Sequence, residues 1–93
     1  MAEKTIHVRI EGRVQGVWFR AWTMQEARER ALSGWVRNCS GGSVEALFSG
    51  APDAVDAMVE ACWSGPPAAR VDNVATSPAN PPDDAGFQGL PTK

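Results

Sequence analysis

The order of the regular segments constrains the fold of this chain more than any other feature of its sequence. Residues 5–11 alternate apolar and polar side chains, the period of a half-buried strand. Residues 19–32 hold good helix formers without glycine or proline. The expected segments are strand Thr5–Glu11, helix Phe19–Leu32, strands Trp35–Cys39 and Ser43–Ser49, a helix opened by Gly50-Ala51-Pro52-Asp53 and ended by Gly65-Pro66-Pro67, and strand Arg70–Ser77. This order predicts an α+β, ferredoxin-like β-α-β-β-α-β sandwich, with two helices on one face of an antiparallel sheet.

The C-terminal residues 78–93 are the least regular part of the chain. They hold four of the seven prolines, and residues 86–91 (GFQGLP) include two glycines. Only Phe87 and Leu90 offer anchors for a short fifth strand, which would lie at the sheet edge. A chain of this size buries roughly 60–65 % of its unfolded surface. We therefore expect one domain over residues 1–93.

Charge is spread unevenly along the chain. The net charge is −2, yet residues 1–37 carry seven of the nine cations against four acids. Residues 38–93 carry two cations against seven acids. The N-terminal part is therefore where an anion site is expected, although a solvated basic helix face has the same composition. The negative total and the lack of an exposed aromatic pair on the predicted strands argue against nucleic acid as a partner.

The N-terminus and the cysteines indicate the compartment. Residues 1–10 lack the apolar core of a signal peptide, and no apolar run approaches the ~20 residues of a membrane span. Cys39 and Cys62 are too few for a disulfide framework. We expect a reduced, cytoplasmic protein, a monomer with no membrane partner.

Residue types exclude several chemistries. Neither lysine follows a glycine as in the phosphate loop of nucleotide hydrolases. Neither cysteine has an arginine six residues later, where a cysteine phosphatase needs one to clamp the phosphate. The single histidine, His7, lies in the predicted first strand without the partners of a serine hydrolase triad or a zinc cluster. We expect no covalent nucleophile, no metal and no cofactor.

The segment between the first strand and the first helix is the best candidate site. Its glycines allow successive backbone N–H groups to point toward an anion, and the helix that follows adds the positive end of its dipole. An arginine in the first helical turn could grip two phosphate oxygens at once. By itself such a loop is also compatible with a tight turn that binds nothing. The segment reads Gly12-Arg13-Val14-Gln15-Gly16-Val17-Trp18-Phe19-Arg20.

This nonapeptide resembles the signature of the acylphosphatase family, small enzymes that hydrolyse the carboxyl–phosphate bond of acyl phosphates. A second segment supports the resemblance, with the residues Gly34-Trp35-Val36-Arg37-Asn38 and then, at matching spacing, Gly42, Val44 and Gly50. The resemblance covers residues 4–77. It implies the ferredoxin-like fold, a metal-independent hydrolase acting on acid anhydrides, and a small acyl phosphate as substrate.

The resemblance also implies roles for individual residues. Arg20 corresponds to the family's phosphate-binding arginine, and Asn38 to its water-orienting asparagine. The loop is implied to lend its backbone amides to the substrate phosphate, to inorganic phosphate or to a similar anion. The loop residues are Gly12, Arg13, Val14, Gln15, Gly16, Val17, Trp18 and Phe19.

Other side chains of the two motifs keep two interpretations. Arg13 and Arg37 either add positive potential or are solvated. Trp18, Trp35 and Phe19 are expected to pack or to wall the pocket rather than to stack on a ligand.

A non-catalytic anion-binding or regulatory module is the alternative, because ferredoxin-like folds carry many unrelated functions. Asn38 would then be only a turn residue before Ser40-Gly41-Gly42. Hydrolysis of an acyl phosphate would separate the two hypotheses.

Overall fold

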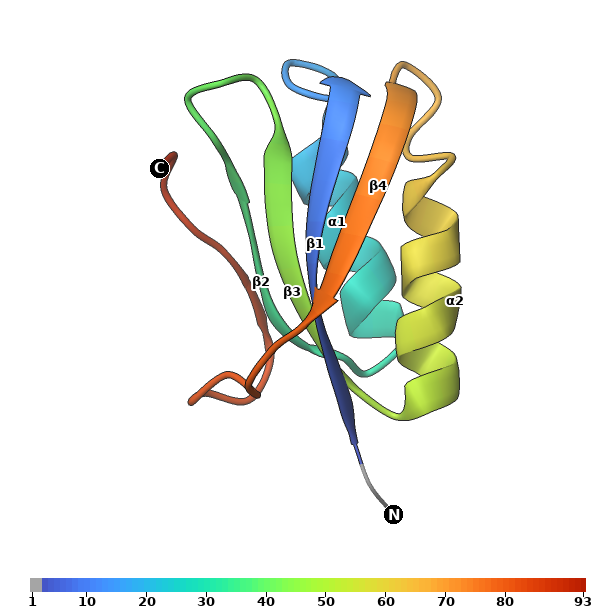
Figure 1. The fold of residues 1–93 in the computed structure, drawn as a ribbon, viewed down its shortest axis with the longest axis vertical. Coiled ribbons are helices and arrows are strands. Elements are labelled where there is room, and N and C mark those ends of the chain that lie inside the picture. Colours follow the sequence, from blue (N-terminus) through green and yellow to red (C-terminus); the bar gives the residue numbers. More distant parts are fainter. Residues whose placement is uncertain (1–2) are drawn as a thin grey trace.

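The predicted succession of strands and helices is present in the computed structural model, which describes residues 3–93 (Figure 1). Two helices lie on the same side of a five-stranded sheet. The elements are β1 Lys4–Arg13, α1 Phe19–Glu29, β2 Ser33–Asn38, β3 Val44–Gly50, α2 Pro52–Cys62, β4 Arg70–Pro78 and β5 Phe87–Gly89. The ferredoxin-like α+β prediction is therefore confirmed, with shifts of a few residues at the element ends.

The strand order is β4-β1-β3-β2-β5. The first four strands pair antiparallel, and Val8 at the centre of β1 faces Ala46 on one side and Thr76 on the other. The fifth strand forms, and it runs parallel to β2, with Trp35 opposite Gln88. The predicted antiparallel sheet therefore comprises β4, β1, β3 and β2, and the possible fifth strand adds a parallel pairing at its edge. The chain crosses over after β4 and enters the edge from the same end as β2.

The hydrophobic core lies between the helices and one face of the sheet. Apolar side chains of even number in β1 and β3 point into it, as their alternation predicts. Phe48 of β3 stacks on Phe87 of β5 with ring centroids 5.6 Å apart, so the fifth strand contributes to the core. The fully buried large side chains include Val8, Ile10, Phe19, Phe48, Val55 and Met58.

Two motif glycines are required by close backbone approaches. Gly12 has φ +130°, and a Cβ there would overlap the carbonyl oxygen of Arg70 in β4. Gly34 has φ +135°, and its Cβ would overlap the carbonyl oxygen of Leu47 in β3. A side chain at either position would force neighbouring strands apart.

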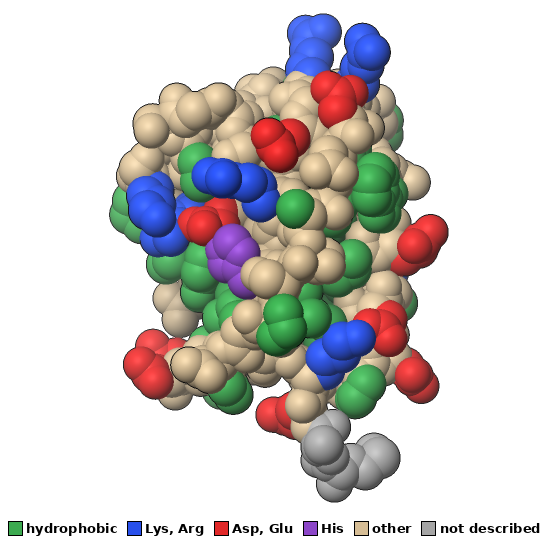
Figure 2. All heavy atoms as spheres, viewed as in Figure 1, with side chains coloured by type: hydrophobic (Ala, Val, Ile, Leu, Met, Phe, Trp, Pro, Cys, Tyr) green, Lys and Arg blue, Asp and Glu red, His purple; other side chains and the backbone are tan. Residues whose placement is uncertain are grey.

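An ionic cluster occupies the face of the sheet opposite the helices. Glu45 accepts hydrogen bonds from His7 at 2.7 Å and from Arg37 at 2.6 Å, and Arg37 lies 4.5 Å above the Trp35 ring. Figure 2 shows the single histidine of the chain on this face, beside acidic and basic side chains. Burial alone would raise the pKa of the Glu45 carboxyl, but the bonds from Arg37 and His7 outweigh it and hold that pKa below its ordinary value of 4.5.

Because of this cluster, the free energy of unfolding should depend on pH. A carboxyl whose pKa is lowered by folding stabilises the protein above its unfolded pKa, and that contribution is lost as pH falls through the folded pKa. We expect Glu45→Gln to lower the free energy of unfolding by about 1 to 2 kcal/mol at pH 7, and by less below about pH 4.5. Urea unfolding at pH 7 and below about pH 4.5 measures this change in the free energy of unfolding. The control is Glu60→Gln, which replaces an exposed carboxylate. An equal loss at both pH values would contradict the role of the ionised carboxylate.

Neither helix described within residues 3–93 has the length and apolar content needed to cross a membrane.

Candidate active site

A cavity of about 490 Å³ lies beside the first turn of α1. It brings together Arg20, at the start of that helix, and Asn38, at the last position of β2. The two residues are far apart in sequence, and each belongs to a different motif. The lining residues are Val14, Gly16, Trp18, Phe19, Arg20, Ala21, Met24, Asn38 and Gly89.

The loop between β1 and α1 is anchored by two apolar side chains. Val14 and Val17 are buried in the core, with 1 % and 6 % of their surface exposed. Gly16, between them, has φ +73° and lines the cavity, and a Cβ there would meet no atom within 4 Å. The glycine is therefore needed for backbone conformation rather than for space.

Gln15 connects the loop to the second motif. Its side-chain amide donates to the carbonyl oxygens of Cys39 and Ser43, both at 2.8 Å. These carbonyls flank the turn between β2 and β3, directly after Asn38. Gln15 therefore fixes the loop relative to Asn38, a role for its side chain that the sequence did not predict.

Arg20 faces solvent at the rim of the cavity. No carboxylate within residues 3–93 lies in salt-bridge range of it, and the first turn of α1 contains no acidic residue. The helix starts after Trp18, which forms no side-chain cap, so the first N–H groups of the helix have no side-chain acceptor there. Positive charge at this end of α1 is thus uncompensated by neighbouring acids.

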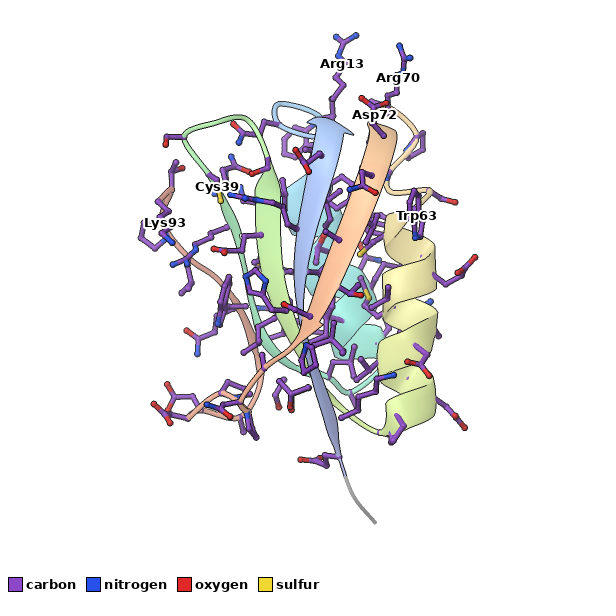
Figure 3. The ribbon with its side chains drawn as sticks, in the orientation of Figure 1. Arg13, Cys39, Trp63, Arg70, Asp72 and Lys93 are labelled. Carbon is purple, nitrogen blue, oxygen red and sulfur yellow. The ribbon has the colours of Figure 1, made fainter. Side chains whose placement is uncertain are left out.

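Asn38 is half-buried and held through its backbone. Its carbonyl oxygen accepts a hydrogen bond from the Lys93 N–H at 3.0 Å, and the Ser40 N–H donates to the Lys93 carbonyl at 3.2 Å. None of the side-chain hydrogen bonds found within residues 3–93 uses the Asn38 amide. In Figure 3, Cys39 and Lys93 both lie toward the left of the view, at the β2 edge of the sheet. The backbone is fixed while the amide is left without a protein partner among the described residues.

The other two motif arginines do not line the cavity. Figure 3 shows Arg13 beyond the end of β1, beside Arg70 and directed away from the body of the protein. Arg37 is engaged with Glu45 and Trp35 on the outer face of the sheet. Neither side chain forms part of the cavity wall.

The aromatic side chains of the motifs divide into two groups. Phe19 is buried in the core and also lines the cavity, whereas Trp18 lines the cavity with 82 % of its surface exposed. Trp35 lies under Arg37 and beside His7, away from the cavity. Phe19 therefore both packs in the core and walls the cavity, Trp18 only walls the cavity, and Trp35 packs on the outer face of the sheet.

Sequence reasoning missed three lining residues, Ala21, Met24 and Gly89. The first two follow Arg20 on α1, Ala21 exposed and Met24 partly buried, and helical spacing could have indicated them. Gly89 belongs to β5, and nothing local in its sequence points to a site. Of the predicted loop residues, Gly12, Arg13, Gln15 and Val17 do not line the cavity.

The fold and the cavity together define a ferredoxin-like α+β protein with an arginine and an asparagine on a shared pocket beside a glycine-containing loop. The sequence matches the acylphosphatase family over residues 6–89. A protein of Rhodospirillum rubrum named acylphosphatase is 53 % identical over 89 residues, which cover 96 % of this chain and 98 % of that protein. This chain belongs to the acylphosphatase family.

Solved structures agree with this assignment. An acylphosphatase from Coxiella burnetii superposes with a TM-score of 0.90 at 40 % identity, covering 95 % of this chain and 93 % of that one. The acylphosphatase from Bacillus subtilis gives a TM-score of 0.87 at 33 % identity, covering 92 % and 97 %. The similarity therefore spans the cavity and both motifs.

Proposed function

We propose that this chain is an acylphosphatase that hydrolyses the carboxyl–phosphate bond of small acyl phosphates to carboxylate and phosphate. The observation that carries the proposal is that Arg20 and Asn38, from two separate motifs, line one cavity at the start of α1. Membership in the acylphosphatase family supports the same activity.

In this proposal the phosphoryl group is bound at the start of α1. The Arg20 guanidinium offers parallel N–H donors that fit two phosphoryl oxygens. Backbone N–H groups of residues 12–19 and the positive end of the helix dipole add to the same field. These groups are fixed before the reaction, so they can stabilise the charge on the transferred phosphoryl group without reorganising. Inorganic phosphate, the product, binds in the same place.

Asn38 positions the attacking water. Its amide is free of protein partners among the described residues, and it can hold a water in line with the scissile bond. An amide cannot take a proton near neutral pH, so the water proton passes to a phosphoryl oxygen of the substrate. The carboxylate is a good leaving group and departs without a general acid. The substrate thus supplies the activation that the protein's side chains do not, and neither a metal nor a cofactor is required.

We infer a single domain over the whole chain that acts as a cytoplasmic monomer without nucleic acid or a membrane as partner. The two cysteines, Cys39 and Cys62, are both buried and unpaired, which fits a reducing compartment. Burial raises the pKa of the Cys62 thiol to about 12, so it remains protonated and has no nucleophilic role.

The decisive experiment is hydrolysis of acetyl phosphate by the purified full chain, followed as phosphate release. We expect turnover well above the uncatalysed rate, unchanged by a large excess of chelator. An anion-binding or regulatory module would bind phosphate without turnover, and that result would reject the proposed activity. Loss of turnover with chelator would leave the activity in place but contradict its metal independence.

A further inference from the structure

The ionic cluster on the outer face of the sheet lies one residue away from the candidate active site along β2. Arg37 and Asn38 are neighbours in this strand, and successive side chains of a strand point to opposite faces of a sheet. Asn38 accordingly lines the cavity, whereas Arg37 lies on the outer face with Glu45 and Trp35. A contact that holds the Arg37 side chain therefore also holds the backbone that carries Asn38.

Glu45 of β3 joins the two strands that lead to the site. Its Oε1 accepts a hydrogen bond from Arg37 Nε at 2.6 Å and lies 2.6 Å from Arg37 Nη2. Its Oε2 lies 2.7 Å from Nε2 of His7 in β1. Arg9, directly opposite Glu45 in β1, forms no ion pair among residues 3–93, so the side-chain link to β1 runs through His7. One carboxylate thus connects β1, which leads into the loop before α1, with β2, which ends at Asn38.

The cluster is shielded from water although it lies on the open face of the sheet. Glu45 has only 9 % of its surface exposed. The Arg37 guanidinium lies 4.5 Å above the centre of the Trp35 ring, and the edge of His7 meets the same ring with centroids 6.1 Å apart. Charge-assisted hydrogen bonds that are shielded in this way compete little with water and keep their geometry.

The Asn38 side chain depends on its backbone for its position. None of the side-chain hydrogen bonds found within residues 3–93 uses its amide. A displacement of about 1 Å in a group that orients reactants can cost about a hundredfold in rate. A small shift at the end of β2 should therefore affect the position of a water held by Asn38.

We propose that Glu45 is a positioning residue for the hydrolysis, which holds Asn38 in place through Arg37. The inference rests on the proposed function, because it requires Asn38 to position the attacking water. Glu45 itself lies on the outer face of the sheet and touches neither the water nor the substrate. Phosphate binding at Arg20 is independent of this contact, because the loop before α1 is anchored by its own buried side chains, Val14 and Val17.

The test measures the effect of Glu45→Gln on acetyl phosphate hydrolysis in wild type and in Asn38→Ala, at a temperature where every variant is folded. In wild type we expect kcat to fall about fivefold, while the inhibition constant for inorganic phosphate changes less than about twofold. In Asn38→Ala the same substitution should change kcat less than about twofold, because the group that Glu45 positions is absent. Arg37→Lys keeps the charge but loses the paired donors, so its kcat should lie between those of wild type and Glu45→Gln.

Ser49→Ala is the matched control. Ser49 is buried in the same strand as Glu45 and hydrogen-bonds to Thr5 of β1 at 2.8 Å, but it pairs with Ser33, at the opposite end of β2 from Asn38. This variant should lower the free energy of unfolding and leave kcat within about twofold of wild type. The positioning role would be overturned by an unchanged kcat in Glu45→Gln, by an equal loss in both backgrounds, or by the same loss in Ser49→Ala. Wild-type protein without turnover would instead overturn the proposed function, and this inference with it.

Discussion

Replacing Arg20 with alanine is expected to lower kcat/KM for acetyl phosphate about a thousandfold. Among residues 3–93, the guanidinium is the only side-chain cation that lines the cavity, and no acid in this range pairs with it. Its removal takes away both phosphate binding and stabilisation of the transition state. Inhibition by inorganic phosphate should weaken in parallel. Initial rates of phosphate release over a range of substrate concentrations measure both effects.

Two further variants make this result specific. Arg70→Ala removes an exposed arginine at the start of β4, which does not line the cavity, and should leave the rates unchanged. Arg20→Lys keeps the charge but loses the paired donors, so its activity should lie between wild type and Arg20→Ala. Because Arg20 is exposed, the melting temperature should stay near that of wild type. Full activity in Arg20→Ala would remove this residue from the mechanism.

Replacing Asn38 with alanine is expected to lower kcat about a hundredfold while the inhibition constant for inorganic phosphate changes less than about twofold. The amide is proposed to hold the water and not the phosphate, so only the chemical step should suffer. The backbone carbonyl, which accepts from the Lys93 N–H, is retained in this variant. Single-turnover kinetics and inhibition by inorganic phosphate separate the two effects.

Asn73→Ala, at an exposed position of β4, provides the matched control and should behave as wild type. If Asn38→Ala weakens phosphate binding as much as it slows turnover, the residue binds phosphate and does not position water. Equal kcat in Asn38→Ala and wild type would support the simpler role of a turn residue. Comparison with Arg20→Ala, which should lose phosphate binding, distinguishes the phosphate-binding role proposed for Arg20 from the water-positioning role proposed for Asn38.

The fold was predictable where the pattern is local. The alternation in residues 5–11 correctly gives the buried face of β1. The first helix ends at Glu29, three residues before the predicted end, because Ala31 adopts φ 56° and turns the chain toward β2. Alanine is a good helix former, so propensity alone favours continuing the helix. Tertiary pairing of Ser33 with Ser49 decides the boundary instead.

The parallel direction of β5 was not predictable, because only long-range contacts determine it. Arg28 of α1 donates to the carbonyl oxygen of Phe87 at 2.9 Å, and the ring of Phe87 stacks on Phe48. Phe87 could be predicted as an anchor for a strand, but nothing in residues 78–93 indicates its partners or the direction of that strand. The same holds for Gly89, which reaches the cavity only because β5 lies beside β2.

The candidate site was predictable where the types of the residues themselves indicate a chemical role. Arginine after a glycine-containing loop indicates anion binding, and the resemblance indicated Asn38. Their presence on one cavity depends on strand order, which only the structure establishes. The side-chain role of Gln15 escaped prediction because its acceptors are backbone carbonyls, which every residue possesses.

That use of backbone acceptors constrains how the turn after β2 can evolve. Gln15 binds the backbone carbonyl oxygens of Cys39 and Ser43 and not the side chains of the turn between them. Gln15 therefore places no constraint on the side chains of this turn, in which Gly42 is needed for its φ of +100°. The insertion or deletion of even one residue would change the separation of the two carbonyls that a single amide spans. The turn can therefore vary in sequence outside Gly42, whereas its length is fixed by the two hydrogen bonds of Gln15.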